Sequence, residues 1–240
     1  MKPRPAALCC IAVVLAACSS STPSAVPRPV PSPSPSSSSI APPEGWTLRS
    51  DALQGYSLAV PDAWDYVVRD SPTFDADLQA INQHSPELGA YFKQSLSSDA
   101  QVQFIAADSR SLQTGFAANL HVMTSDLGPV GSAASLKDLV DAKVKLLSAQ
   151  ASVVQPLHRA PDHLSGQPAV LLEYSLAGSA NIPLVRSYLV VLQRGGRGYE
   201  YELTMGALPD AASITFATLS QFFRLVPPAR GTPSTAPRSP

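Results

Sequence analysis

The sequence predicts an α+β domain in which helices flank a central antiparallel sheet, giving a layered sandwich. Three observations predict this class. Several short segments alternate apolar and polar residues as strands do, others carry apolar residues at helical spacing, and the last third is a strand meander followed by a helix. Strands joined by short turns pair antiparallel, and sheets and helices bury their apolar faces against each other in layers.

The first strand is expected at residues 56–60, where the segment YSLAV alternates large apolar and small side chains. Pro61 and Asp62 then end the strand, because both residues favour turns. Trp64 is expected to pack its indole over the end of this strand. A role in stacking against a ligand is the alternative interpretation of Trp64.

Two short helices are expected between residues 73 and 96. Proline is unfavourable inside a helix but fits the first turn, so Pro86 divides the segment and Ser85 is expected to cap the second helix. The apolar residues of the segment keep to one helical face: Leu78, Ile81, Leu88 and Phe92. Residues 102–108 and 117–124 are expected to follow as an antiparallel pair of strands.

The clearest helix is expected at residues 135–150, where Ser135 and Asp138 have the spacing of a capping box. A meander of strands is expected next, at residues 152–157, 169–176, 184–193 and 199–205. The segment QRGGRG, residues 193–198, is a hairpin turn rich in residues that accept positive φ. A final helix at residues 211–223 is expected to cover this sheet with its apolar side chains: Ile214, Phe216, Leu219, Phe222 and Phe223.

The N-terminal segment has the features of a bacterial lipoprotein signal peptide, expected at residues 1–17. Basic residues precede an apolar run from Ala6 to Ala17, which is too short for a bilayer span of about 20 residues. The run ends in LAAC, residues 15–18, which resembles a lipobox, so Cys18 is expected to become the lipidated first residue of the mature protein. An ordinary signal peptide with a chance cysteine is the alternative. Cleavage there removes Cys9 and Cys10, leaving no pair for a disulfide and no cysteine-based metal or catalytic site.

A Ser/Pro-rich tether is expected at residues 18–43, since 10 of the 25 residues after Cys18 are serine and 8 are proline. Such a segment buries too little apolar surface to offset the entropy of ordering, so it is expected to stay disordered and extended. Residues 227–240 have the same character and are expected to form a disordered tail. The folded domain is then expected at residues 44–226, a length typical of one domain.

The charge of this domain argues against a nucleic-acid partner. Of the 17 basic residues in the chain, 12 lie in the domain with all 18 acidic residues, giving a net charge of −6. Proteins that bind nucleic acid or anionic lipid through one face carry clustered basic residues there. No nucleic-acid partner is therefore expected. The signal peptide and lipobox instead predict an extracytoplasmic location, with the membrane reached through the lipid on Cys18 and a protein or envelope component as the partner of the domain.

Four segments resemble the Mog1/PsbP fold and, more closely, actinobacterial lipoproteins of the LpqN type. They are YSLAVPDAW (56–64), LSGQPAVLLEY (164–174), VRSYLVVLQRGGRGYEYELT (185–204) and FFRL (222–225). All four are structural motifs, so the resemblance implies a fold and carries over no catalytic residue. Members of this family dock partner proteins or assist envelope and membrane complexes, which implies a binding role by analogy.

The sequence contains no motif for a nucleophilic serine or a phosphate-binding loop, and no cofactor is expected. The cluster of His158, Asp162 and His163 lacks a known zinc spacing, and a polar loop is the favoured interpretation. A paired-carboxylate glycosidase is the one enzyme class kept as an alternative, with Glu200 and Glu202 about 7 Å apart on one sheet face. Three aspartates near Trp64 are a weaker choice for the same role: Asp62, Asp65 and Asp70.

The leading hypothesis is a membrane-anchored lipoprotein whose domain binds its partner without catalysis. The binding surface is expected on the sheet face that helices leave uncovered, or in a groove beside Trp64. Arg186 and Tyr188 are candidate anchors, because these residue types are enriched at interfaces. A carrier of lipid or of another small molecule, with an apolar cavity between its layers, is the second hypothesis.

Overall fold

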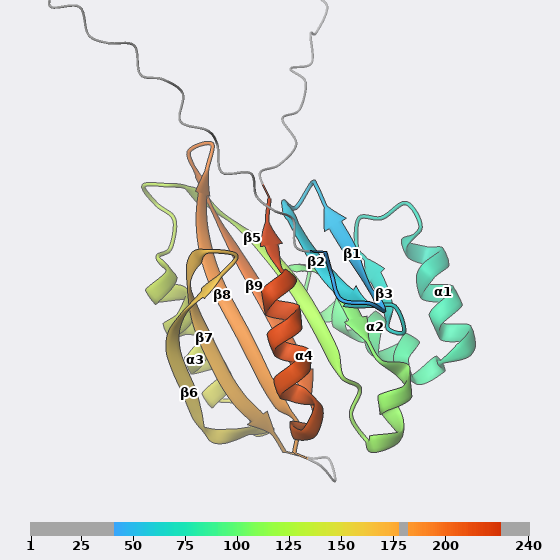
Figure 1. Cartoon of the computed structure of the whole chain (residues 1–240). Coiled ribbons are helices and arrows are strands. Elements are labelled where there is room, and N and C mark those ends of the chain that lie inside the picture. The colour runs from blue at the N-terminus through green and yellow to red at the C-terminus, as the bar shows by residue number, and fades with distance from the viewer. Residues whose placement is uncertain (1–40, 178–181, 227–240) are drawn as a thin grey trace, which may run out of the picture. The chain divides into compact units, whose positions relative to one another are not determined.

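A seven-stranded antiparallel sheet forms the centre of the structure, with strands in the order β3-β4-β5-β9-β8-β7-β6 (Figure 1). The computed structural model describes residues 41–177 and 182–226, which belong to one compact unit. The predicted signal peptide with Cys18, nearly all of the predicted tether and the predicted tail lie outside the described residues. The strands of this sheet are β3 Asp65–Val68, β4 Val102–Ala107, β5 Asn119–Pro129, β6 Val153–Leu164, β7 Gln167–Leu176, β8 Leu184–Arg194 and β9 Arg197–Ala207.

One face of the sheet is covered by helix α4 (Pro209–Phe222) and by a small second sheet. The small sheet has the order β1-β2-β10, from β1 Trp46–Asp51, β2 Tyr56–Pro61 and β10 Arg224–Leu225. Its inward side chains and those of α4 share the largest core cluster with alternate residues of β5, β8 and β9. Figure 1 shows α4 and the β1-β2 hairpin lying side by side on this face.

The opposite face carries two separate helical layers. Helices α1 (Phe74–His84) and α2 (Pro86–Ser98) cover β3 and β4, and their apolar residues form one core cluster. Helix α3 (Leu136–Ser148) covers β6, β7 and β8 and forms another cluster. Because the two clusters are separate, the middle strands β5 and β9 lie between the helical layers on this face.

The predicted fold class is confirmed, and most of the predicted elements appear near their expected positions. The chain divides at Ser85 with Pro86 at the start of α2, but the Ser85 side chain makes no capping hydrogen bond. The capping box of Ser135 and Asp138 is present at the start of α3. In the final helix Ile214 is 75% exposed, so it faces away from the sheet that it was expected to cover.

Three features differ from the prediction. Strands β1, β3 and β10 were not expected, and β2 belongs to the small second sheet rather than to the central one. Strands β4 and β5 are joined through a 3₁₀ helix, η1 (Ser109–Thr114), which was not expected. The segment around His158 and His163 is part of the long strand β6, because it pairs with β7 through Leu164, so the loop interpretation was wrong.

Candidate functional site

An open cleft lies on the sheet face between α2 and α3, over the uncovered middle strands. Its volume is about 580 Å³, within the range of small-molecule sites. The walls come from Tyr91 on α2, from the segment after η1, from Lys143 and Leu147 on α3, and from β7. This is the kind of uncovered sheet face on which the sequence led us to expect a binding surface.

The floor of the cleft is made by β5, β9 and β8. Asn119 on β5, Gly206 on β9 and Val185 on β8 lie opposite one another across the three strands. The middle residue of this row is a glycine, which has no side chain. A Cβ atom on Gly206 would lie 2.9 Å from Cζ of Phe116, which shows how closely the Phe116 ring approaches the backbone. The glycine therefore leaves room for an aromatic side chain against the floor.

A chain of polar side chains runs along the floor below Lys143. The Nζ atom of Lys143 lies 2.9 Å from Oε2 of Glu202, and the Thr204 hydroxyl donates to Oε1 of Glu202 at 2.7 Å. The hydroxyls of Thr204 and Ser187 lie 2.8 Å apart. The Glu202 side chain is 4% exposed and that of Lys143 is 22% exposed. A buried carboxylate needs such partners, because an unpaired charge away from water is costly.

Glu200 and Glu202 project from the same face of β9, as the alternation of the strand predicted. Burial raises the pKa of Glu200, and the negative charge of Glu202 raises it further. Glu202 is held by Lys143 and Thr204, so its two oxygens are already engaged within the fold. Glu202 therefore forms a structural ion pair with Lys143 below the cleft.

His121 and Tyr91 form the second polar contact of the cleft. The Tyr91 hydroxyl lies 2.9 Å from Nε2 of His121, linking α2 to β5. Burial lowers the pKa of His121 to about 4, and the positive charge of Lys143 acts in the same direction. Burial also raises the pKa of Tyr91 and of Tyr174, each to about 12. At neutral pH these three residues therefore offer uncharged donors and acceptors.

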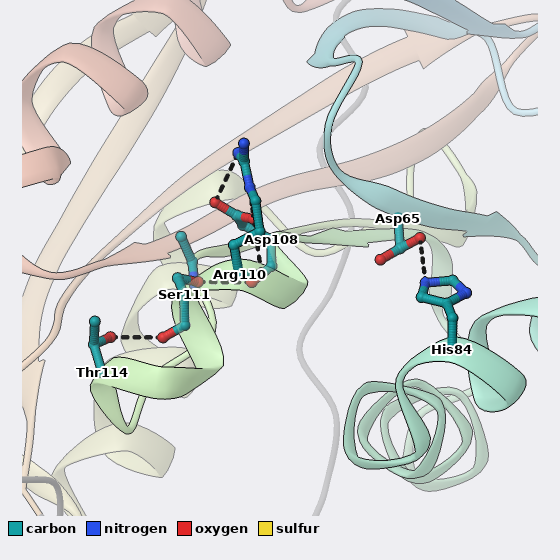
Figure 2. Close-up of polar contacts among 7 residues, drawn as sticks. Asp65, His84, Asp108, Arg110, Ser111 and Thr114 are labelled. Carbon is teal, nitrogen blue, oxygen red and sulfur yellow. Dashed lines mark hydrogen bonds and ion pairs between the residues drawn. The ribbon is translucent and has the colours of Figure 1, made fainter.

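The rim beside Phe116 is held in shape by η1 and the residues around it. Asp108 accepts hydrogen bonds from the backbone and the guanidinium of Arg110, and the Ser111 hydroxyl donates to the Asp108 carbonyl at 2.7 Å (Figure 2). The Thr114 hydroxyl donates to the Ser111 carbonyl at 2.6 Å. Leu112 in this turn and Phe116 just after it both line the cleft. A separate contact in Figure 2, between Asp65 and His84, links β3 to α1 outside the cleft.

The candidate interface residues lie elsewhere. Trp64 is 8% exposed and Tyr188 is 6% exposed, and both belong to the core cluster under α4, so they offer little side-chain surface to a partner. Arg186 forms an ion pair with Glu173 at 2.6 Å, and its guanidinium lies 5.4 Å from the centre of the Phe216 ring. None of the three lines the cleft.

The candidate metal ligands do not converge. His158 and Asp162 share one face of β6 and His163 projects from the other, since successive side chains alternate along a strand. Among the described residues, no group of three or more His, Cys, Asp or Glu side chains is placed to hold a metal ion. The three aspartates near Trp64 also make separate contacts: Asp62 with Thr47, Asp65 with His84, and Asp70 with Gln54.

The residues that build the cleft were missed as a site, although most of them belong to predicted elements. His121 was interpreted as a strand residue and Lys143 only as part of a helix, and no spacing in the sequence links either to Tyr91. They meet because β5, β9 and two helices from distant segments converge.

Within residues 41–177 and 182–226, no helix is long and apolar enough to cross a membrane.

Two proteins are described among the solved structures that match the fold. One is LpqN of Mycobacterium tuberculosis, described as involved in cell envelope biogenesis, with a TM-score of 0.47, 14% identity, and coverage of 72% of this chain and 83% of LpqN. The other is the cyanobacterial PsbP protein CyanoP of Synechocystis sp. PCC 6803, with a TM-score of 0.45, 17% identity, and coverage of 75% of this chain and 92% of that chain. These likenesses agree with the predicted resemblance to the PsbP-like fold and to LpqN, and they concern the fold alone. No family model and no curated protein matches the sequence.

Proposed function

We propose that the protein is an extracytoplasmic lipoprotein whose domain binds an amphipathic component of the cell envelope in the cleft between α2 and α3, without catalysis. In this proposal residues 1–17 are a signal peptide, Cys18 carries the lipid, residues 18–43 are the tether and residues 227–240 are a tail. The domain of residues 44–226 would then act at a distance from the membrane set by the tether.

The observation that carries the binding role is the composition of the cleft. Its lining includes the apolar and aromatic side chains of Phe116, Leu147 and Leu176, and its polar groups lie on the floor and on both helices. Ligand sites in proteins combine an apolar lining with a few placed polar groups in this way. A molecule with an apolar part and an uncharged polar part fits both surfaces.

The contacts of the polar groups support binding rather than turnover. The Lys143 ammonium is paired with Glu202, and the Tyr91 hydroxyl with His121. A general base or nucleophile needs a reactive atom free to approach the substrate, and its pKa should lie near the operating pH. His121, with its pKa lowered to about 4, is too weak a base for that role at neutral pH.

The lipid anchor is tested by Cys18→Ala. We expect the variant to appear in the soluble fraction or as an uncleaved precursor, whereas the native protein stays with membranes. Mass spectrometry of the native N-terminal peptide should find an acylated cysteine. Normal processing and membrane retention of Cys18→Ala would show that the anchor is wrongly assigned.

The cleft is tested with the uncharged fluorescent probe N-phenyl-1-naphthylamine and two matched variants. Phe116→Ala removes an aromatic wall and is expected to weaken probe binding about tenfold, since contact between two aromatic rings contributes up to about 1.5 kcal/mol and about 1.4 kcal/mol corresponds to a tenfold change. Phe74→Ala is the control, because Phe74 is a similarly half-buried ring at the start of α1 and does not line the cleft. Equal binding by both variants would place the probe elsewhere and remove the support for this site.

A further inference from the structure

A second cavity lies toward the other end of β5 and β9, where the β1-β2 turn meets the β8-β9 hairpin. Its volume is about 400 Å³. Leu53 and Gln54 from the turn, Thr124 and Asp126 from β5, and Tyr199 and Tyr201 from β9 line it together with Arg194. None of these residues lines the cleft between α2 and α3, so the two cavities are distinct.

Arg194 is fixed in this cavity by contacts with uncharged groups. Its guanidinium carbon lies 5.5 Å from the centre of the Tyr201 ring, and Nη1 donates to the Tyr201 hydroxyl at 3.2 Å. That hydroxyl donates in turn to the backbone carbonyl of Gln54 at 2.8 Å. Gly55 allows the close approach, because a Cβ atom there would lie 2.5 Å from Nη1 of Arg194.

The positive charge of Arg194 is not matched by a carboxylate in the described part of the chain. Asp126 also lines the cavity, but it pairs with Arg197 at 2.7 Å and accepts the backbone N–H of Gly128. Asp51 accepts two backbone N–H groups of the β1-β2 turn, from Leu53 and Gln54. No ion pair to Arg194 occurs within residues 41–177 and 182–226.

The rest of the cavity is suited to a flat apolar group. The Leu53 side chain is 82% exposed at the edge of the cavity, and the rings of Tyr199 and Tyr201 form part of its wall. The Thr124 hydroxyl donates to Oε1 of Gln54 at 2.8 Å, which fixes that amide beside the guanidinium. An apolar ligand that covers the exposed leucine and the two tyrosine rings removes apolar surface from water, which is favourable.

We propose that this second cavity binds the carboxylate of a small organic acid with a flat apolar body, and that Arg194 is the residue that recognises the carboxylate. A guanidinium presents two parallel N–H donors that match the two oxygens of a carboxylate. Because Arg194 is already held in place, little side-chain entropy is lost when the ligand binds. The same chemistry occurs in free acids and at the carboxyl terminus of a peptide, and the experiment separates these sources.

The test uses the whole mature protein and two matched probes, 3-phenylpropionate and its amide, with binding followed by NMR titration. We expect the acid to bind and the amide to bind at least tenfold more weakly, because only the acid can pair with the guanidinium. A tripeptide ending in phenylalanine, with a free or an amidated carboxyl terminus, forms the second arm. Tighter binding of the free tripeptide than of 3-phenylpropionate would identify a peptide terminus as the source, and the reverse order a free acid.

Arg194→Gln is expected to weaken binding of the acid at least tenfold, and Arg194→Lys to weaken it less, since it keeps the charge but loses the two-pronged geometry. Arg159→Gln is the control, because Arg159 is an exposed arginine paired with Asp141 and lines neither cavity. Thermal unfolding of each variant shows whether the fold is retained, and shifts of the Leu53 and Thr124 signals report the cavity directly. Any one of three results would overturn the proposal. They are equal affinity for acid and amide, no loss of affinity on Arg194→Gln in the folded protein, and no binding of any probe at 10 mM, a concentration of roughly ten times a weak millimolar Kd.

Discussion

Replacement of Lys143 by methionine tests the ion pair below the cleft. Methionine keeps most of the apolar stem of the lysine and removes only the ammonium, so Glu202 is left as a carboxylate that is 4% exposed. Removal of one partner from a buried ion pair costs about 3–5 kcal/mol. Thr204 still donates to Oε1 of Glu202, and Lys143 was itself 22% exposed, so water can reach part of the site. We therefore expect the lower end of that range, about 3 kcal/mol.

Urea unfolding at pH 7 measures this cost. With a slope of about 2 kcal/mol per molar urea, the midpoint of Lys143→Met should fall by about 1.5 M. Lys145→Met on the same helix is the control, because Lys145 is exposed, and it should change stability by less than about 0.5 kcal/mol. The double variant Lys143→Met/Glu202→Gln should recover much of the loss, since a neutral amide has no unpaired charge to bury.

The cost of Lys143→Met should also depend on pH. An unpaired buried carboxylate has a raised pKa, so the unfolding free energy of Lys143→Met should increase, relative to the native protein, as the pH is lowered toward 5. A cost below about 0.5 kcal/mol for Lys143→Met, or strict additivity of the two single changes in the double variant, would refute the description of this pair as buried and coupled.

Three further predictions follow from other contacts. Ser135→Ala removes the acceptor for the Asp138 backbone N–H and should cost about 1 kcal/mol in urea unfolding, whereas an unchanged midpoint would contradict the capping role. His121 has a folded pKa of about 4 against an ordinary value of 6.5, so the unfolded chain binds a proton at a higher pH than the native protein does. The native protein should therefore lose up to about 3 kcal/mol of stability as the pH falls from about 6.5 to 4. His121→Gln should show a shallower decline over that window, and an identical decline would argue against a buried neutral imidazole. Gly206→Ala places a Cβ atom 2.9 Å from the Phe116 ring, so it should either cost about 1–3 kcal/mol of stability or displace the ring and weaken binding of the neutral probe. If calorimetry shows no loss of stability and fluorescence shows no loss of binding, the ring is free to move.

The helices and the meander were predictable because their apolar patterns are local. The stripe of α3 and the Ser135–Asp138 box define that helix from within its own segment. The hairpin at residues 193–198 is likewise fixed by its glycines and the alternation of the flanking strands, and the sheet order β9-β8-β7-β6 follows the chain. Each of these elements is stabilised mainly by neighbours in sequence, so the sequence pattern is informative.

The small second sheet was not predictable in the same way. Its strand β10 has only two residues, and it pairs with a strand far away in the chain, since Arg224 lies opposite Ser57. The strand β1 carries Leu48 outward at 50% exposure and has no strong apolar alternation. Such strands form because the face of a larger sheet is available to cover, and that face exists only after the chain has folded.

The candidate anchors show the same limit at the level of single residues. Tyr188 and Trp64 are residue types common at interfaces, but the register of β8 and the position of α4 bury both of them. Arg186 and Arg194 lie on the same strand, yet the register places Arg186 opposite Glu173 on β7, whereas Arg194 reaches a cavity with no carboxylate partner in the described chain. Strand register decides which partner a charged side chain meets.

The sequence by itself determined the α+β class of the domain, and through Cys18 and its flanks it predicts an extracytoplasmic location. Both depend on short stretches of chain whose chemistry is complete within a few residues. Only the tertiary structure decided where the molecule is open: a cleft arises because two helical layers cover the edges of one sheet face and leave its middle strands bare. The partners of Lys143, His121 and Arg194 come from distant segments, and their distances are set by packing and strand register rather than by spacing along the chain.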